Sequence, residues 1–338
     1  MSEDKISLEH GAGGKTMMKL IEDIILKELG DEDSLPVGLR DLDDGAAVKV
    51  GDKTIVFSTD SHTIKPLFFP GGDIGRLAVA GTVNDMAVMG GKPIAMAGAM
   101  VLSEGFPTDD LRKILRSMKK TADEAGVSLA TGDTKVVEKG ALDGMIITTT
   151  GVGLAESVKT DNGLKPGDKI IVTGNIGEHE AAIIAQREGI DTRESIKSDV
   201  APIWKTIEAG LKAGGITAMK DPTRGGLAGS LNELASKSGV GIALDEEKIP
   251  ISDPVSNICD LLGIDPFNLT NEGKAIIGVE GEKVQAVLEA IKGTKYGKEA
   301  RVIGEVNDDH PGRVTLTTSV GGHRIIRPSV GAPTPRIC

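Results

Sequence analysis

Cysteine is almost absent from this chain of 338 residues, which contains only Cys259 and Cys338. Two cysteines cannot form a disulfide framework, and neither belongs to a pair spaced like the ligands of a zinc site. Cys259 stands at helical spacing with Val255, Ile258 and Leu262, which predicts a small buried side chain. Cys338 is the last residue of the sequence, and its thiol needs a different explanation.

Aromatic side chains and long apolar segments are also scarce. Phe, Trp and Tyr make up 2% of the residues, so few platforms exist for stacking the bases of single-stranded nucleic acid. No apolar run is long enough to span a membrane, and the opening MSEDKISLEH lacks the basic and apolar regions of a signal peptide. The net charge of −11 disfavours nucleic acid and anionic membranes as partners. We therefore expect a cytoplasmic protein that binds neither.

Strand and helix patterns alternate along the chain and predict a mixed α/β fold, of the α+β type, with two domains. Apolar residues at helical spacing over 16–29 predict an amphipathic helix. A polar segment, ESVKTDNGLKPGD, separates two series of strand and helix patterns and is typical of a linker. The predicted parts are a loop and helix in 1–40, an N-terminal domain in 41–157, a C-terminal α/β domain in 158–327 and a flexible tail in 328–338.

The predicted tail ends in TPRIC and contains Pro328, Pro333 and Pro335, which disfavour a helix or a central strand. Fully extended, its residues would span roughly 35 Å. Such a tail could enter a pocket and leave it again. The tail alone does not establish a function for Cys338, and an accidental cysteine is the more ordinary explanation, because chain termini tolerate change.

The segment HGAGGKT, residues 10–16, is rich in glycine. It is not a P-loop, because Glu9 stands where that motif requires its first glycine and no strand pattern precedes it. Its backbone N–H groups, together with His10 and Lys15, could still close over phosphate groups. A loop without a binding role is the alternative.

Aspartates recur at the ends of apolar segments in the first half of the chain. A carboxylate in such a place is costly unless it is paired or binds a cation. Several carboxylates together would suit Mg²⁺, which accompanies nucleotide phosphates. A turn or cap is the ordinary role of one such residue, but five of them favour a shared site. The candidates are Asp43, Asp44, Asp60, Asp85 and Asp133, with the amide of Asn84 beside them.

These segments carry a resemblance to a known family that covers nearly the whole chain. DLDDGAAV, STDSH, GTVNDMAVMGGKP, TGDTKVV, GEHE, DPTRGGLA and NEGK occur in the order found in the aminoimidazole ribonucleotide synthetase-like (PurM-like) superfamily of ATP-using enzymes. HGAGG and the terminal PRIC resemble the hydrogenase maturation factors of the HypE family. Selenophosphate synthetase is disfavoured because no cysteine precedes Cys259. Two departures concern GEHE, where Glu178 and Glu180 replace Asp and Gly around His179, and the lack of an aromatic residue near Asn268.

The resemblance implies a PurM-like two-domain fold, a homodimer formed through the N-terminal sheets, and Mg²⁺–ATP bound by the N-terminal domain. It implies that a carbamoyltransferase, HypF, carbamoylates Cys338 and that ATP drives dehydration of this S-carboxamide to a thiocyanate. The thiocyanate would supply the cyanide ligand of the [NiFe]-hydrogenase iron through the iron-carrying HypC–HypD complex. The implied Mg²⁺–ATP site comprises Asp43, Asp44, Asp60, Asn84, Asp85, Asp133, Thr223, Arg224 and Lys15.

Glu272 in NEGK and Lys135 in GDTK are the pair that we expect at the carbamoyl group, Glu272 as the base and Lys135 as its charge partner. An interdomain salt bridge would use the same two charges and is the alternative. Thr223 and Arg224 precede a predicted helix, which suits phosphate contact or capping.

Two rival functions follow from the same observations. One is another PurM-like ATP-dependent synthetase or kinase that acts on a free small molecule. The other is a thiol-tethering or redox binding module, which would leave the clustered aspartates without a use.

Overall fold

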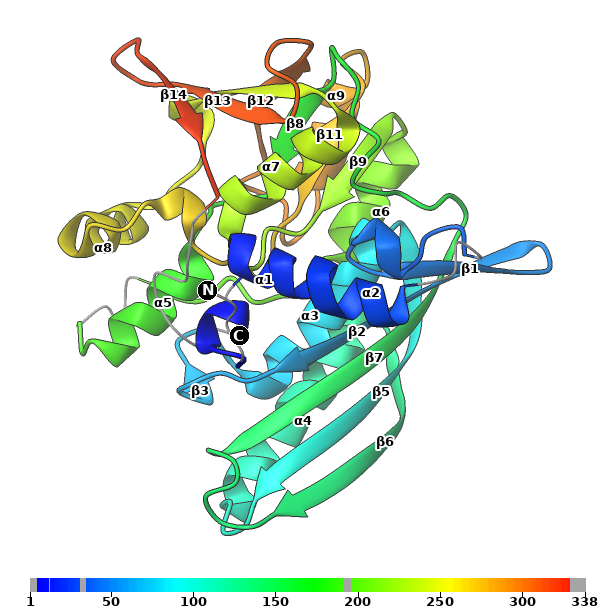
Figure 1. Ribbon diagram of the computed structural model, residues 1–338, viewed down its shortest axis with the longest axis vertical. Coiled ribbons are helices and arrows are strands. Elements are labelled where there is room, and N and C mark those ends of the chain that lie inside the picture. The colour runs from blue at the N-terminus through cyan, green and yellow to red at the C-terminus, as the bar shows by residue number, and fades with distance from the viewer. Residues whose placement is uncertain (1–4, 12, 31–34, 191–195, 329–338) are drawn as a thin grey trace.

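The computed structural model describes residues 5–11, 13–30, 35–190 and 196–328, and two β-sheets form its framework (Figure 1). The tail with Cys338 lies outside the described residues. The first sheet has the strand order β1-β2-β7-β5-β6. Its strands are β1 (Ala46–Val50), β2 (Lys53–His62), β5 (Gly91–Ser103), β6 (Ser128–Val137) and β7 (Met145–Ala155). Strands β3 (Phe68–Phe69) and β4 (Gly72–Asp73) form a separate short pair.

The second sheet has the strand order β14-β13-β10-β12-β8-β11-β9. Both sheets are mixed, since β5 pairs with β6 and β10 with β13 in parallel whereas their other neighbours are antiparallel. The predicted α+β class is therefore confirmed. The strands of the second sheet are β8 (Lys169–Val172), β9 (Ile216–Lys220), β10 (Gly241–Asp245), β11 (Ile276–Val279), β12 (Arg301–Asn307), β13 (Arg313–Thr317) and β14 (His323–Ile326).

Helices α3 (Ile74–Val88) and α4 (Thr108–Ala125) pack beside the first sheet (Figure 1). Asp73 caps α3, because its Oδ1 accepts the N–H groups of Gly75 and Arg76. Apart from Arg76 and Asp85, the residues of α3 are buried, since the helix packs on β2 and β7 and also contacts α6 and β9 of the second half. Helix α3 thus packs against elements of both halves of the molecule.

The described part of the second half contains five further helices, and a short helical segment precedes the first sheet. Near the N-terminus, α1 (Gly14–Leu20), a π-helical turn (Ile21–Ile25) and α2 (Leu26–Leu29) form the helix that the sequence predicts, but the apolar side chains of Ile25 and Leu29 are exposed. Among the described residues, no helix is long and apolar enough to cross a membrane. The helices of the second half are α5 (Glu178–Arg187), α6 (Trp204–Ala213), α7 (Gly226–Ser238), α8 (Asp253–Leu262) and α9 (Val284–Lys292).

The segment between β7 and β8 is more than a loose linker. Asp161 is buried there, and its Oδ2 lies 2.7 Å from Lys237 Nζ and 3.4 Å from Lys220 Nζ. These ion pairs fix the segment against β9 and α7. The boundaries of the two domains themselves stay a prediction.

Candidate active site

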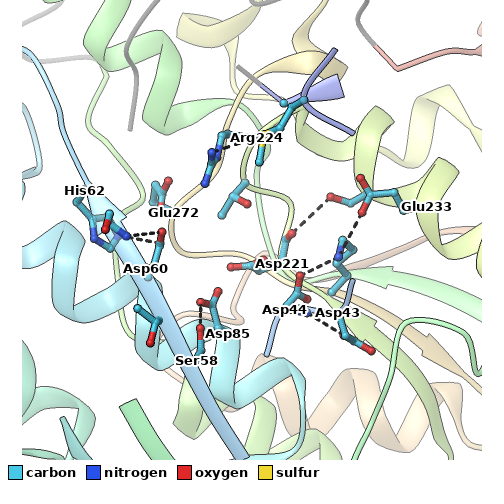
Figure 2. Close-up of a pocket in the computed structure, with 18 of the residues that line it drawn as sticks. Asp43, Asp44, Ser58, Asp60, His62, Asp85, Asp221, Arg224, Glu233 and Glu272 are labelled. Carbon is cyan, nitrogen blue, oxygen red and sulfur yellow. Dashed lines mark hydrogen bonds and ion pairs between the residues drawn. The ribbon is translucent and has the colours of Figure 1, made fainter. Parts of the chain in front are cut away.

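A pocket of about 300 Å³ lies where elements of both halves meet (Figure 2). Strand β2 and helix α3 line it from the first half. The segment after β9, helix α7 and the loop before β11 line it from the second. The start of α1 lies against Arg224, and a Cβ on Gly13 would come within 3.1 Å of the Arg224 Cβ. Because Gly13 also has a φ of 81°, glycine suits this close approach.

Negative charge dominates the pocket. Seven carboxylate side chains line it, whereas only Lys220 and Arg224 contribute a permanent positive charge among the described lining residues. A nucleotide triphosphate would be repelled from such a surface unless cations entered with it. The carboxylates belong to Asp43, Asp44, Asp60, Asp85, Asp221, Glu233 and Glu272.

Asp85 on α3 and Asp221 after β9 face this pocket from opposite halves. Ser58 Oγ donates a hydrogen bond of 2.6 Å to Asp85 Oδ2. Burial, followed by repulsion from Asp221, raises the pKa of Asp85 well above its ordinary value. Burial, followed by repulsion from Asp44, likewise raises the pKa of Asp221. A cation between these carboxylates would offset the repulsion that raises both pKa values.

Asp60 and His62 are two residues apart on β2, so their side chains leave the strand on the same face. His62 is buried, and its Nε2 lies 3.0 Å from Asp60 Oδ2. Burial raises the pKa of Asp60, but the hydrogen bond from His62 and its charge outweigh burial, so the pKa of Asp60 is lowered. A Cβ at Gly81 would come within 2.7 Å of His62 Nε2. Glycine on α3 therefore leaves room for this pair.

Lys220, at the end of β9, is the buried cation of the pocket. Its Nζ lies 2.7 Å from Asp44 Oδ1 and 3.3 Å from Glu233 Oε2. Burial lowers the pKa of Lys220, but these carboxylates outweigh burial, and the pKa lies well above its ordinary value. The second oxygen of Asp44, Oδ2, is buried without a hydrogen-bond partner. That oxygen is available as a ligand atom.

Asp43 joins the pocket to the segment between the two sheets. Its carboxylate accepts the N–H of Asp44 at 2.9 Å and the N–H of Asp161 at 3.2 Å. Burial, together with repulsion from Asp161 and Asp44, raises the pKa of Asp43 to about 7. Asp43 can therefore change charge near neutral pH.

The donor set suits Mg²⁺ chemically, because that ion prefers oxygen ligands. Asp44 Oδ2 has no hydrogen-bond partner, and the pKa values of Asp85 and Asp221 are raised. Lys220 and Arg224 therefore do not balance the negative charge of the pocket. Within the described ranges, however, no three His, Cys, Asp or Glu side chains converge closely enough to hold a metal ion by themselves. A metal ion there would take its remaining ligands from phosphate oxygens or water.

Glu272 lies in the loop before β11 and is only 4% exposed at the pocket wall. Its backbone N–H donates to Asp199 Oδ1 at 3.1 Å, and its carbonyl accepts from Asn84 Nδ2 at 3.2 Å. Thr223 and Arg224 also line the pocket. One guanidinium nitrogen of Arg224 is 3.5 Å from the Gly11 carbonyl oxygen. Most of the predicted site residues that the structure describes are thus brought together.

Four predicted residues do not line this pocket. Asn84 is buried, and its amide bonds only backbone groups in the contacts described: Ala201 O, Glu272 O and the N–H of Ile203. Asp133 and Lys135 lie on exposed β6 and pair with each other at 3.1 Å, so Lys135 does not pair with Glu272 of the same chain. Lys15 is exposed on α1.

The divergent GEHE segment is built into the core. His179 is fully buried, its Nδ1 lies 2.7 Å from Ser198 Oγ, and its ring packs edge-on against Phe69. The Glu180 carboxylate accepts the N–H of Thr270 at 2.8 Å. These contacts give the segment a structural role in shaping the surroundings of Glu272.

Five further residues of the pocket were not singled out from the sequence: Ser58, His62, Lys220, Asp221 and Glu233. The sequence did contain a signal for Asp221. The residue follows the apolar segment ITAM after one lysine, and the other candidate aspartates also lie near apolar segments. No sequence signal places Lys220 or Glu233 beside Asp44, since the contacts join residues far apart in the chain.

Two family models match consecutive parts of the chain. The N-terminal domain of AIR synthase related proteins matches residues 42–155, and the C-terminal domain of the same proteins matches residues 165–317. The carbamoyl dehydratase HypE of Cupriavidus necator is 44% identical over 338 residues, which cover 99% of this chain and 95% of that protein.

Two solved structures are similar over nearly the full length. A chain in the crystal structure of a HypE–HypF complex has a TM-score of 0.86 at 43% identity, and the match covers 92% of this chain and 99% of that one. The crystal structure of a hydrogenase maturation protein HypE in complex with ATP has a TM-score of 0.82 at 38% identity, with 99% and 100% covered. The pocket, the fold and these similarities lead to one conclusion: the chain belongs to the HypE family of carbamoyl dehydratases, with the PurM-like fold.

Proposed function

We propose that this protein is an ATP-dependent carbamoyl dehydratase whose substrate is a carbamoyl group on its own Cys338. The observation that carries the proposal is the pocket of seven carboxylates at the junction of the two halves, which requires cations and suits Mg²⁺–ATP. The HypE–ATP complex of a relative and the name of the Cupriavidus necator protein support it. The products would be protein thiocyanate, ADP and phosphate. The thiocyanate would provide the cyanide ligand for [NiFe]-hydrogenase iron.

The chemistry explains why ATP is needed. A carboxamide loses water slowly, because hydroxide is a poor leaving group and the amide N–H is a weak acid. Transfer of the γ-phosphoryl group to the carbamoyl oxygen forms a new O–P bond, breaks the bond to ADP and releases one proton from nitrogen. The oxygen then belongs to a phosphate leaving group. Loss of the second N–H proton expels phosphate and leaves S–C≡N.

The lining residues have distinct roles in this proposal. Asp44, Asp60, Asp85 and Asp221 would hold Mg²⁺, whose charge neutralises the phosphates when it is bound. Arg224, with Thr223 beside it, would contact the transferred phosphoryl group. Lys220 orients the Asp44 carboxylate through its 2.7 Å ion pair. Asp43 would also belong to the nucleotide site, and its contact with the N–H of Asp161 orders the segment around that residue.

Glu272 is the proposed base that removes a proton from the carbamoyl nitrogen. It is buried at the pocket wall. Its backbone N–H donates to Asp199, and its backbone carbonyl accepts from Asn84. A base with a fixed backbone keeps its carboxylate within reach of one position in the pocket. Removal of the carboxylate should stop dehydration without preventing ATP binding.

Lys135 and Asp133 would reach a pocket only from a second copy of the chain. We propose a homodimer through the first sheet, whose outer face is left exposed by the helices of the described residues. Phe57 and Val152 stand opposite each other on β2 and β7 and are both more than a third exposed, and Leu154, two residues further along, is 40% exposed. A second copy would bury this apolar face in a two-fold interface. Strand β6, with Asp133 and Lys135, would then face the partner.

The homodimer proposal can be tested by mixing two variants. Lys135→Ala and Glu272→Gln should each be inactive alone. If Lys135 of one copy serves Glu272 of the other, random exchange makes half of the dimers mixed, each with one intact site, and about a quarter of the wild-type activity should return. No recovery despite demonstrated subunit exchange would contradict a shared site.

The partners follow from the proposed chemistry. A carbamoyltransferase, HypF, would load Cys338, in line with the HypE–HypF complex of a relative. The iron-carrying HypC–HypD complex would remove the cyanide. The main rival is another PurM-like ATP-dependent synthetase or kinase acting on a free small molecule, and deletion of residues 336–338 should leave that activity intact.

Intact mass spectrometry tests the proposed function directly. The protein is incubated with HypF, carbamoyl phosphate and ATP, and then with further Mg²⁺–ATP. We expect a gain of one carbamoyl group followed by ATP-dependent loss of one water. Cys338→Ala should show neither change, whereas Cys259→Ala, the matched control at the buried cysteine, should show both. A carbamoyl adduct that never loses water would refute the dehydratase proposal.

A further inference from the structure

Asn84 lies on α3 beside Asp85, but its side chain is buried and contacts backbone groups of the second half instead of lining the pocket. Its Oδ1 accepts the N–H of Ile203 at 2.9 Å, and its Nδ2 donates to Ala201 O at 3.1 Å and to Glu272 O at 3.2 Å. With all three contacts made, the amide is fully engaged within the protein. Asn84 is therefore placed to hold protein segments together rather than to bind nucleotide.

The segment 198–203, which we call the ledge, runs between α3 and Glu272. Arg76, two turns before Asn84 on α3, donates through Nε to Val200 O at 2.8 Å. Asn84 bonds the ledge at two further points, the carbonyl of Ala201 and the N–H of Ile203. Helix α3 thus fixes the ledge through two side chains.

The ledge in turn fixes Glu272. The N–H of Ala201 donates to Glu272 O at 3.2 Å, and Asp199 Oδ1 accepts the N–H of Glu272 at 3.1 Å. Asp199 is anchored by Lys274, whose Nζ lies 3.3 Å from its Oδ2. The carbonyl of Glu272 is shared between the ledge and Asn84. Its backbone is therefore held from both sides.

From these contacts we propose that Asn84 is a positioning residue that fixes the base Glu272 relative to the pocket carboxylate Asp85. Asn84 and Asp85 are neighbours on the same rigid helix, so a hydrogen bond from Asn84 to Glu272 sets the position of one functional carboxylate against the other. Misplacement of a reacting group by about 1 Å can lower a rate by about a hundredfold. The inference rests on the proposed role of Glu272 as the base.

Asn84→Asp tests the inference with little change in volume. The aspartate can still accept the N–H of Ile203, but as a carboxylate it donates to neither Glu272 O nor Ala201 O, and as the protonated acid it donates to only one of them. We expect the single-turnover dehydration of carbamoylated Cys338 to slow at least tenfold, while the dissociation constant for Mg²⁺–ATP changes less than threefold. Asn84→Ser provides a neutral second variant should the buried aspartate prevent folding.

A matched control is available on α7. Asn232 Nδ2 also donates to two backbone carbonyls, Ala228 O at 2.8 Å and Ile326 O at 3.2 Å, and does not line the pocket. Asn232→Asp should change the thermal melting temperature in a similar way and leave the dehydration rate within twofold of wild type. Equal slowing by both variants would show a general loss of rigidity and overturn the inference.

A double-variant cycle identifies the route of the effect. If Asn84 acts through Glu272, Asn84→Asp should cause little further slowing in a Glu272→Asp background, which keeps a carboxylate but in a changed position and so retains a measurable rate. The same fold-loss in both backgrounds would overturn the inference, as would a wild-type rate in Asn84→Asp. A wild-type protein that binds ATP but never dehydrates its carbamoylated cysteine would instead refute the proposed function.

Discussion

The ligand-free protein should lose stability as the pH rises towards neutrality, and Asp43 provides the clearest case. Burial, with repulsion from Asp161 and Asp44, raises the pKa of Asp43 from 3.8 to about 7. Between these values the folded protein keeps a proton on Asp43 that the unfolded chain has released. The stabilisation that this proton provides is fully present below the pKa that Asp43 has in the unfolded chain. It is lost as the pH rises through the pKa that Asp43 has in the folded protein.

The size of the effect follows from proton linkage. One extra proton on the folded state lowers the free energy of unfolding by about 1.4 kcal/mol for each pH unit, and a shift of about three units amounts to about 4 kcal/mol at pH 8. Asp43→Asn removes this loss. The substitution also leaves the N–H of Asp161 without its acceptor, which costs about 1–3 kcal/mol. At pH 8 the variant should therefore be more stable than wild type by about 1–3 kcal/mol, and near pH 4 it should be less stable.

Urea denaturation at several pH values between 4 and 8, with a chelator and without nucleotide, measures both curves. The slope of stability against pH should be less steep in Asp43→Asn by up to about 1.4 kcal/mol per pH unit. Asp52→Asn, at a side chain that is 88% exposed, controls for the removal of one negative charge. Parallel curves for wild type and Asp43→Asn would refute the reasoning.

Three further predictions concern the pocket. Glu272→Gln should bind Mg²⁺–ATP within threefold of wild type yet accumulate the carbamoylated protein, and a normal thiocyanate yield by mass spectrometry would remove Glu272 from the mechanism. Arg224→Ala should lower turnover at least tenfold with little change in melting temperature, since its side chain is exposed and its contacts with Gly11 and Met17 are long; unchanged turnover would contradict phosphate contact. A chelator should abolish ATP binding measured by calorimetry, because seven carboxylates line the pocket; equal affinity without divalent cations would argue against a metal-dependent site.

The sequence predicts long, regular elements well and exposed or short strands poorly. The apolar patterns of 71–90, 109–126 and 226–238 predict helices, and α3, α4 and α7 are found there, because each buries a continuous face. Strand β6 is not predicted, since LATGDTKVV lies along an exposed edge and has no core face to impose an alternation. Strand β9 is missed for another reason: it has only five residues, too few for a clear period.

For the pocket, residue type was a better guide than local pattern. Four of the five predicted aspartates, all except Asp133 on exposed β6, line one pocket, because several carboxylates beside apolar segments are best accommodated around shared cations. Lys220 and His62 could not be predicted, since their roles depend on partners brought together by tertiary packing or by the pleat of a strand. Asn84, in contrast, was predicted as a site residue but does not line the pocket. An amide beside Asp85 resembles a ligand in sequence, but its partners are the backbone groups of residues more than a hundred positions away.

The stability lost at this pocket and its affinity for a cation have the same origin. If a lysine partnered each carboxylate as Lys220 partners Asp44, the folded protein would be more stable, but no charge would remain to attract a metal ion. Asp85 and Asp221 instead face each other across the two halves with raised pKa values. Because the pKa values of both carboxyl groups are raised, protons compete with a divalent cation for them, and cation binding should weaken as the pH falls. A cation that enters with a nucleotide would therefore offset the repulsion among these carboxylates.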